Sequence, residues 1–419
     1  MALGADALSA VGSGLTLPFL MVYLHAVRGL GLGVAGAATA TVALAGLVGN
    51  PVGGAWVDRS GPRRVLVAGW AVAAVGACGL AVVSRPWQAF MAAAVSGLGV
   101  ALALPAQDAL LARLVPEQGR SGAFAVRHAT FNLGLAVGGL AAALLADVAN
   151  PSSFVLLYVL DAASFVLAIL VLVCGTPILA AALAAEGDAP NADGPVPVGG
   201  YRAVAQDRLF VRLWVLLAVL VAVGFAQFNA SFAVFMTEAG MNVGLMGVAF
   251  TANMVTVTAA QLVVLKLARG SRRTTAIRVL CGLWALSWAL VLAGTRLQAG
   301  TAAVAFILAA VTFALGETLF APTLPALVNN IAPETLRGRY NGAAAFAYAA
   351  GFAAGPAVAG ILLQHHLTIP LLAGLILGCV AASLLAASVR RRLPKAADLI
   401  DPPTAVSQRD SASPLAPKP

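Results

Sequence analysis

The chain has 419 residues, of which 61% are hydrophobic and only 10% are charged. An ordinary soluble domain carries about 25% charged residues, so this composition excludes that class of protein. The formal net charge of +9 raises the question of a nucleic-acid partner, which the positions of the basic residues answer below.

Twelve apolar segments follow one another along the chain, each about as long as the roughly 20 residues that a membrane-crossing helix requires. They predict an all-α membrane protein with twelve transmembrane helices. The expected helices span about residues 5–27, 33–57, 63–84, 88–112, 123–147, 152–175, 209–236, 244–267, 275–295, 300–328, 340–364 and 368–390.

The longest polar interval lies between the sixth and seventh segments. It predicts two six-helix bundles, over residues 1–175 and 209–390, joined by a linker over residues 176–208. Residues 391–419 begin with arginines and then become polar and proline-rich, a composition typical of a disordered tail at the membrane surface.

The basic residues are distributed asymmetrically over the predicted loops. Of the 25 Lys and Arg residues, only Arg28, Arg85 and Arg296 fall on one side of the membrane. Because cytoplasmic loops carry the excess of Lys and Arg, the pattern places both termini, the linker and the loop at Asp58 in the cytoplasm. We therefore expect a multi-pass protein of the cell membrane with no nucleic-acid partner.

Several other classes of site have no support in the sequence. The four cysteines lie inside apolar segments, without the spacing of a disulfide framework or a metal site. The chain contains no Gly-x-x-x-x-Gly-Lys-Ser/Thr loop for nucleotide phosphates. The first apolar segment has no basic leader, so no cleavable signal peptide is predicted. We expect no enzyme activity, no cofactor and no metal.

An internal repeat indicates that the two halves are pseudo-symmetric. Residues 98–117 recur as residues 315–334, with identical Leu-Gly, Pro, Ala-Leu and Pro-Glu positions offset by 217 residues. A Gly-x-Arg-Arg turn occurs at Gly61 and again at Gly270, but the second copy has Leu267 where the first has an acid. Parallel halves of this kind place a substrate site at their interface near the bilayer midplane.

The loop over residues 54–64 reads Gly-Ala-Trp-Val-Asp-Arg-Ser-Gly-Pro-Arg-Arg. Together with the twelve helices and the repeat, it resembles the major facilitator superfamily over about residues 5–390. The run from Gly316 to Thr323, with the Ala-Pro-Glu that starts at Ala332, resembles the helix 10–11 region of the family's drug:proton antiporter-like exporters.

The resemblance implies a gating role for this loop, whose aspartate in the family stabilises the outward-facing state at a contact between helices 2 and 11. The residues concerned are Gly54, Asp58, Arg59, Gly61, Arg63 and Arg64. We expect Gly54 to allow a close approach to helix 11, and Asp58 to face that helix's positive N-terminal end. The chain departs from the family at Pro62, where a basic residue is usual. The alternative is a loop that only follows the positive-inside bias.

Glu317 is the candidate for proton coupling. It lies about eleven residues from the cytoplasmic end of predicted helix 10, roughly 16 Å along the axis and so near the midplane. A carboxyl group at that depth is costly and tends to face a cavity or a partner. The alternative is a structural carboxyl group that is hydrogen-bonded to a neighbouring helix.

The resemblance also implies that helices 1, 4, 7 and 10 line the central cavity. Aromatic and amide side chains on these helices are candidates for contact with an amphipathic substrate. The candidates are Phe19, Tyr23, Phe225, Phe228, Asn229, Phe232, Phe313 and Phe320. Aromatic residues at helical spacing are also typical of ordinary packing.

We expect two further acids to be structural. Asp108 lies near the cytoplasmic end of helix 4, within reach of Arg113 or of the arginines in the helix 2–3 turn. Asp161 lies deep in helix 6, which is peripheral in the family. Arg127, at the start of helix 5, is expected to extend to the cytoplasmic surface.

The sequence thus predicts a secondary active transporter for a small amphipathic molecule, working by alternating access as a proton-coupled exporter. The alternative is a proton-coupled symporter or a uniporter that imports a metabolite; a membrane enzyme or receptor has much less support. Helix 4 lacks the arginine, and helix 5 the Gly-Pro pair, of a complete drug:proton antiporter. The expected partners are a small-molecule substrate, protons and the lipid bilayer, and one chain suffices as a functional monomer.

Overall fold

The computed structural model describes residues 2–115, 120–174, 201–320, 322–333 and 336–400. In this part of the chain, eleven helical segments are long and apolar enough to cross a membrane, and the shorter apolar helix Ala129–Leu145 completes the set. The predicted all-α, twelve-crossing fold is therefore confirmed.

The N-terminal half contains the first six crossings. The first is α1 (Ala2–Thr16), η1 (Leu17–Phe19), α2 (Leu20–Val22) and η2 (Tyr23–Val27); then follow α3 (Leu32–Ser60), α4 (Pro62–Ala81), α5 (Pro86–Leu114), α6 (Arg120–Leu145) and α7 (Pro151–Cys174). Proline occupies the first position of α4, α5 and α7, where its missing N–H has no intrahelical partner to lose. Gly61 turns α3 into α4 with a φ of 79°, a conformation that glycine adopts without strain.

The C-terminal half begins with a short helix in the segment expected to be linker. The elements are α9 (Tyr201–Gln206), α10 (Arg208–Leu220), η4 (Val221–Phe225), α11 (Ala226–Glu238), α12 (Val243–Ala268), α13 (Arg273–Gly294), α14 (Ala299–Glu317), α15 (Leu324–Ile331), α16 (Arg337–Gln364), α17 (Thr368–Arg390) and α18 (Lys395–Asp398). Asp207 caps α10 by accepting hydrogen bonds from two backbone N–H groups, at 2.9 and 3.1 Å. Seventh-crossing continuity through η4 and α11 matches the single helix predicted there.

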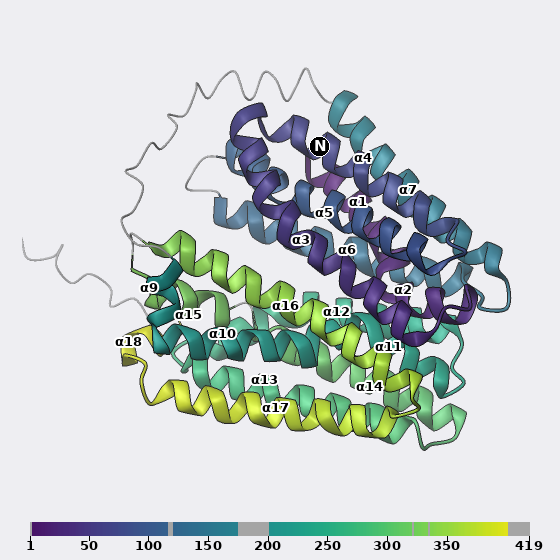
Figure 1. Ribbon diagram of the computed structural model, residues 1–419. Helices are drawn as coiled ribbons and strands as arrows, with labels where there is room; N and C mark the ends of the chain where they lie inside the picture. The colour runs from purple at the N-terminus through teal and green to yellow at the C-terminus, as the bar shows by residue number, and fades with distance from the viewer. Residues whose placement is uncertain (1, 116–119, 175–200, 321, 334–335, 401–419) are drawn as a thin grey trace, which may run out of the picture.

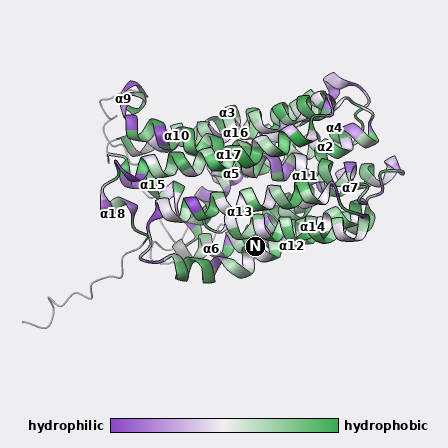
Figure 2. Cartoon of the chain, turned by 90° about the horizontal axis from the view of Figure 1, so that it is seen from below, coloured by the Kyte–Doolittle hydropathy of each residue, from purple (hydrophilic) through white to green (hydrophobic). Residues whose placement is uncertain are grey.

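The two halves form two adjacent bundles (Figure 1). The end of the molecule that holds α9, α15 and α18 is called the linker end below, and the other the opposite end. Hydrophobic residues dominate along the helices, whereas hydrophilic residues gather near the two ends (Figure 2), as expected for helices that cross a bilayer.

The tenth crossing differs from the single helix predicted over residues 300–328. Helix α14 ends at Glu317 and α15 begins at Leu324. Pro322 explains the break, because its ring removes one backbone donor and clashes with the carbonyl group four residues earlier. Neighbouring side chains hydrogen-bond the released carbonyl groups: Arg273 donates to Pro322 O at 2.9 Å, and Gln261 donates to Thr318 O at 3.4 Å.

The bundles touch directly at the opposite end, along a seam of small residues. A Cβ atom added to Gly36 of α3 would lie 3.0 Å from Gly360 Cα of α16. The N–H of Gly33 donates to Gln364 Oε1 at 3.0 Å. Helices α6 and α12 meet likewise, with Thr251 donating to a carbonyl oxygen of α6 at 3.2 Å. Small residues let helix backbones approach closely, so this end is closed.

The tail corrects the expectation of disorder from residue 391 onward. Residues up to Ile400 pack on the start of α13: Asp398 accepts hydrogen bonds from the Thr274 N–H at 2.9 Å and from its hydroxyl group at 2.8 Å. The backbone of Ile400 bonds Gly270 and Ser271, and its side chain is fully buried. Asp398 thereby brings a carboxylate to the Gly270 turn, the copy that has no acid of its own. Residues 401–419 lie outside the described part.

Substituting Asp398→Ala should destabilise the protein, because it removes a carboxylate that caps a helix N-terminus, an interaction worth about 1 kcal/mol. We expect a lower Tm for the detergent-solubilised protein. Lys395→Ala, on the exposed side of the same short helix, is the matched control and should leave the Tm unchanged. Equal Tm values for both variants would contradict a capping role for Asp398.

Candidate functional site

A cavity of about 1150 Å³ lies between the two bundles. Its walls come from both halves: α3 and α5 on one side, and α10, α11, α15 and α16 on the other. It extends from mid-depth, at Pro356 and Leu20, to the linker end, at Val328 and Asn341. Since the seam at Gly36 closes the opposite end, the described conformation gives access to the cavity from the linker end.

The cavity lining is apolar, with a few uncharged polar groups. Among the described residues, no charged side chain contributes to the wall. The polar groups include the amides of Asn50, Asn229 and Asn341. A mostly apolar pocket with a few polar groups is typical of a small-molecule site, and this one suits an apolar or amphipathic compound.

The predicted cavity residues divide into two groups. Asn229 and Phe320 line the cavity, and Phe225 packs behind the wall with its ring centroid 4.9 Å from that of Phe320. The other five are at most 2% exposed and form part of the core: Phe19, Tyr23, Phe228, Phe232 and Phe313. Phe228 and Phe313, for example, stack with centroids 4.3 Å apart. Packing, the alternative for these side chains, therefore describes the five in this conformation.

The sequence interpretation missed much of the wall, because it considered helices 1, 4, 7 and 10. Helices α3 and α16, the second and eleventh crossings, contribute Asn50, Asn341 and Tyr348. Single amides inside otherwise apolar segments were the available signal, since a lone polar side chain in a crossing tends to face a cavity or a partner.

Glu317 is the last residue of α14, at the edge of the break in the tenth crossing. Its carboxyl group is hydrogen-bonded by the side chain of Asn253 from α12, which also donates to Ala310 O at 3.2 Å. Tyr348 interacts with it electrostatically from α16 and also lines the cavity. The carboxyl group therefore lies one side chain away from the cavity.

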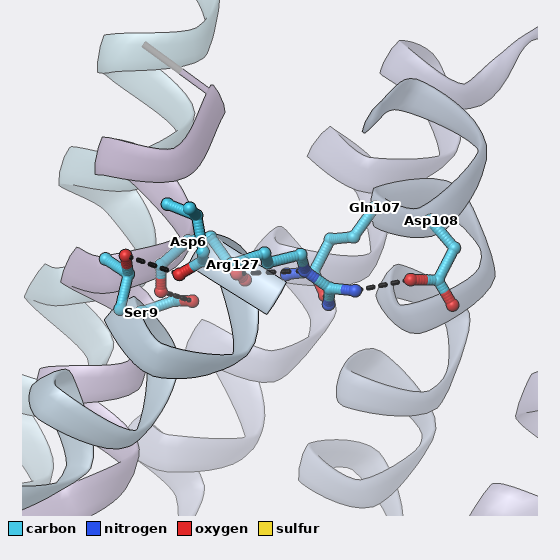
Figure 3. A network of polar contacts seen from close by, with 7 residues as sticks. Asp6, Ser9, Gln107, Asp108 and Arg127 are labelled. Carbon is cyan, nitrogen blue, oxygen red and sulfur yellow. Dashed lines mark hydrogen bonds and ion pairs between the residues drawn. The ribbon is translucent and has the colours of Figure 1, made fainter. Parts of the chain in front are cut away.

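A charged network joins α1, α5 and α6 within the N-terminal bundle (Figure 3). Arg127 donates to Asp6 at 3.0 Å and to Gln107 at 2.7 Å, and it forms an ion pair with Asp108. Asp108 thus has a structural ion pair, as expected, but with Arg127 rather than with Arg113 or the helix 2–3 turn. The Arg127 side chain is only 16% exposed, so it does not extend to the surface as predicted. It places a guanidinium group between α1 and α5, although the fourth crossing has no arginine.

The loop after α3 makes no contact with α16 through Gly54 in this conformation. A Cβ atom added to Gly54 would meet nothing within 4 Å. The glycines of α16 instead pack on the seventh crossing, where added Cβ atoms at Gly351 and Gly355 would lie 2.7 Å from Ala218 O and Ala226 Cβ. The side chain of Asp58 lies outside the described residues, so its contact with helix 11 stays a prediction.

The sequence model of the major facilitator superfamily matches residues 3–356 and 229–415. The chain belongs to this family. The resemblance stated from the sequence is thereby confirmed, and so is the expectation of a transporter rather than an enzyme. Members of this superfamily carry small molecules across membranes, and the uncharged cavity between the bundles is where such a molecule would bind.

Individual relatives agree with this assignment. The chain is 25% identical over 364 residues to the uncharacterized MFS-type transporter YttB of Bacillus subtilis (strain 168), covering 86% of each chain. It is 25% identical to a Na(+), Li(+), K(+)/H(+) antiporter of Planococcus maritimus, covering 80% of this chain and 82% of the relative. A solved structure of a peptide transporter in complex with alafosfalin shares the fold, with a TM-score of 0.72 at 16% identity over 95% of this chain and 94% of that chain.

Substituting Gly36→Val should force α3 and α16 apart at the opposite end, since even a single Cβ atom there meets backbone at 3.0 Å. The measurement is the yield of a disulfide between Gly33→Cys and Gln364→Cys in a background without the native cysteines. We expect the yield to fall. Gly282→Val, where an added Cβ meets nothing within 4 Å, is the matched control. An unchanged yield with Gly36→Val would show that the seam does not need glycine.

Proposed function

We propose that the protein exports a small amphipathic molecule across the cell membrane in exchange for protons. The observation that carries the proposal is a partly buried carboxyl group, Glu317, one side chain away from an uncharged cavity between two bundles. The relative named as a cation/proton antiporter supports exchange rather than cotransport.

The asymmetric distribution of basic residues supports the assignment of the linker end to the cytoplasm. Both termini then lie in the cytoplasm, and the described conformation is inward-facing, with the cavity accessible to a cytoplasmic substrate. The seam at Gly36 is the external closure. Outward opening requires that this seam separates while the bundles meet at the linker end.

The cost of a buried charge gives a reason for exchange. While the bundles change places, the carboxyl group of Glu317 is enclosed in a low-dielectric site, where an unpaired carboxylate is expensive. The transition is therefore favourable when Glu317 holds a proton, or when a cationic group of the substrate neutralises it. One occupant crosses outward and the other inward, which is antiport.

The loop over residues 54–64 is proposed to stabilise the outward-facing state. In the inward-facing conformation, Gly54 has open space where a partner helix would approach. When the linker end closes, α16 can occupy that space, and the carboxylate of Asp58 would lie near the N-terminal end of α16, where the helix dipole favours it. The loop then shifts the populations of the two states.

Substituting Glu317→Gln should abolish proton-driven transport, because the amide cannot bind and release a proton. In proteoliposomes with an imposed pH gradient, we expect the uptake of ethidium, a cationic amphipathic probe, to drop about tenfold or more while its binding changes less. Glu238→Gln, an exposed acid at the opposite end, is the matched control.

Retention of gradient-driven ethidium uptake by Glu317→Gln would refute the coupling role. A wild-type protein that moves the probe in the same direction as the protons would instead support the symporter alternative. A panel of neutral and cationic probes in the same vesicles distinguishes substrate class from direction.

Substituting Asp58→Asn should impair transport and leave membrane insertion intact, because it removes the charge that favours the outward-facing state. We expect a larger inward-facing population, measured as a higher yield of the Gly33→Cys to Gln364→Cys disulfide. Asp147→Asn, an exposed acid at the opposite end, should change neither quantity. Normal transport by Asp58→Asn would exclude a gating role.

A further inference from the structure

Asp161 is a deeply buried carboxyl group that the proposed transport mechanism does not use. It lies in the middle of α7, is 6% exposed, and faces α1. Its Oδ2 atom accepts a hydrogen bond from the Thr16 hydroxyl group at 2.8 Å. Its Oδ1 atom is buried without a hydrogen-bond partner among the described residues. A Cβ atom added to Gly12 of α1 would lie 2.6 Å from Oδ1, so the two helices enclose the carboxyl group tightly.

The groups around Asp161 include no counter-ion. The ion pairs found within the described ranges both belong to Arg127. The titratable group nearest along α7 is Tyr158, one turn away, whose buried hydroxyl group also has no partner there. Tyr23 stacks on Tyr158 with centroids 4.7 Å apart, and it receives a hydrogen bond from Arg28 at 2.6 Å. The cation of this cluster is thus bound to Tyr23, not to Asp161.

An unpaired carboxylate at this depth is expensive, so the enclosed Asp161 is far cheaper as a neutral acid. The single hydrogen bond from Thr16 is compatible with that form, because a protonated carboxyl group still accepts through its other oxygen. Loss of the proton would leave a buried anion with one donor. The group can therefore ionise only if α1 and α7 rearrange to admit water or another donor, of which the Tyr158 hydroxyl group is the nearest unpartnered one.

The partner of Asp161 lies where the first crossing changes its helix type. Thr16 ends α1, and the next residues form η1 with a proline at its second position. Leu17 and Leu20, directly after Thr16, line the cavity. Asp161 is therefore connected through one hydrogen bond to a helix interruption that shapes the cavity wall. Glu317 occupies a comparable place in the other bundle, at the interruption of the tenth crossing.

We propose that Asp161 is a second proton-binding site of the transporter, and that its proton sets the conformation of the first crossing at Thr16–Leu20. In the enclosed state Asp161 is protonated and the wall at Leu17 and Leu20 stands as described. When the proton passes to water, the carboxylate draws donors toward it, and the break after Thr16 changes shape. The proposal rests on proton-coupled transport in that it adds a second proton to the cycle.

The test needs no knowledge of the substrate. Infrared difference spectra of the purified protein, taken between acidic and alkaline buffer, report carboxyl groups that lose a proton. We expect a band from a protonated carboxyl group that disappears in Asp161→Asn and persists in Glu317→Gln. The asparagine still accepts the hydrogen bond from Thr16, so a purely structural role would leave the variant folded with the band intact.

A second readout follows the cavity wall. Leu17→Cys, in a background without the native cysteines, is reacted with a maleimide at both pH values. The labelling rate should depend on pH in the parent protein and in an Asp147→Asn control, and this dependence should be lost in Asp161→Asn. If Asp161→Asn does not fold, Thr16→Val keeps the acid, removes its donor, and should shift the pH at which the band disappears.

Persistence of the band in Asp161→Asn, or unchanged pH-dependent labelling of Leu17→Cys in that variant, would overturn the proposal. For Thr16→Val, an unshifted band would overturn it as well. Failure of the proposed transport function is a separate outcome: Glu317→Gln would then retain gradient-driven uptake, whatever the spectra show for Asp161.

Discussion

The cost of charge in the bilayer organises this molecule. Each acid inside the bundles is neutralised in one of two ways. Asp6 and Asp108 share the guanidinium group of Arg127, which ties α1, α5 and α6 together near the linker end. Glu317 and Asp161 have instead a neutral donor each, from Asn253 and Thr16. The first kind of acid is held permanently by an ion pair, whereas the second depends on a proton or another cation.

Both acids of the second kind are coupled to an interrupted helix. Interruptions expose backbone groups that must be satisfied inside the bilayer, and the tenth crossing achieves this with Arg273 and Gln261. A continuous helix resists bending because every backbone group is bonded within it. A helix that is already broken can change its angle at much smaller cost, so a proton at its edge has a mechanical effect that it would not have elsewhere.

The sequence was sufficient for the fold because the length and apolar character of a crossing are direct consequences of bilayer thickness. The two halves followed from the repeat and the polar interval. The rotation of each helix was not predictable: crossings that are apolar on every side give no periodicity, so Phe228 and Phe313 could not be separated from Phe320 as core and wall. The pairing of Arg127 and the docking of Asp398 depend on contacts between distant segments, which no local pattern contains.

Alternating access requires two closures that exclude each other, and the chain uses small residues at both. At the opposite end, Gly36 and Gly360 allow α3 and α16 to touch. Toward the linker end of the same helix α3, Gly54 has open space on its surface. Because α3 is one continuous helix of 29 residues, contact at one of its ends with α16 tilts the other end away. Rigidity of α3 therefore makes the two closures alternatives, and whichever acids are neutral when the seam opens decide what is carried through.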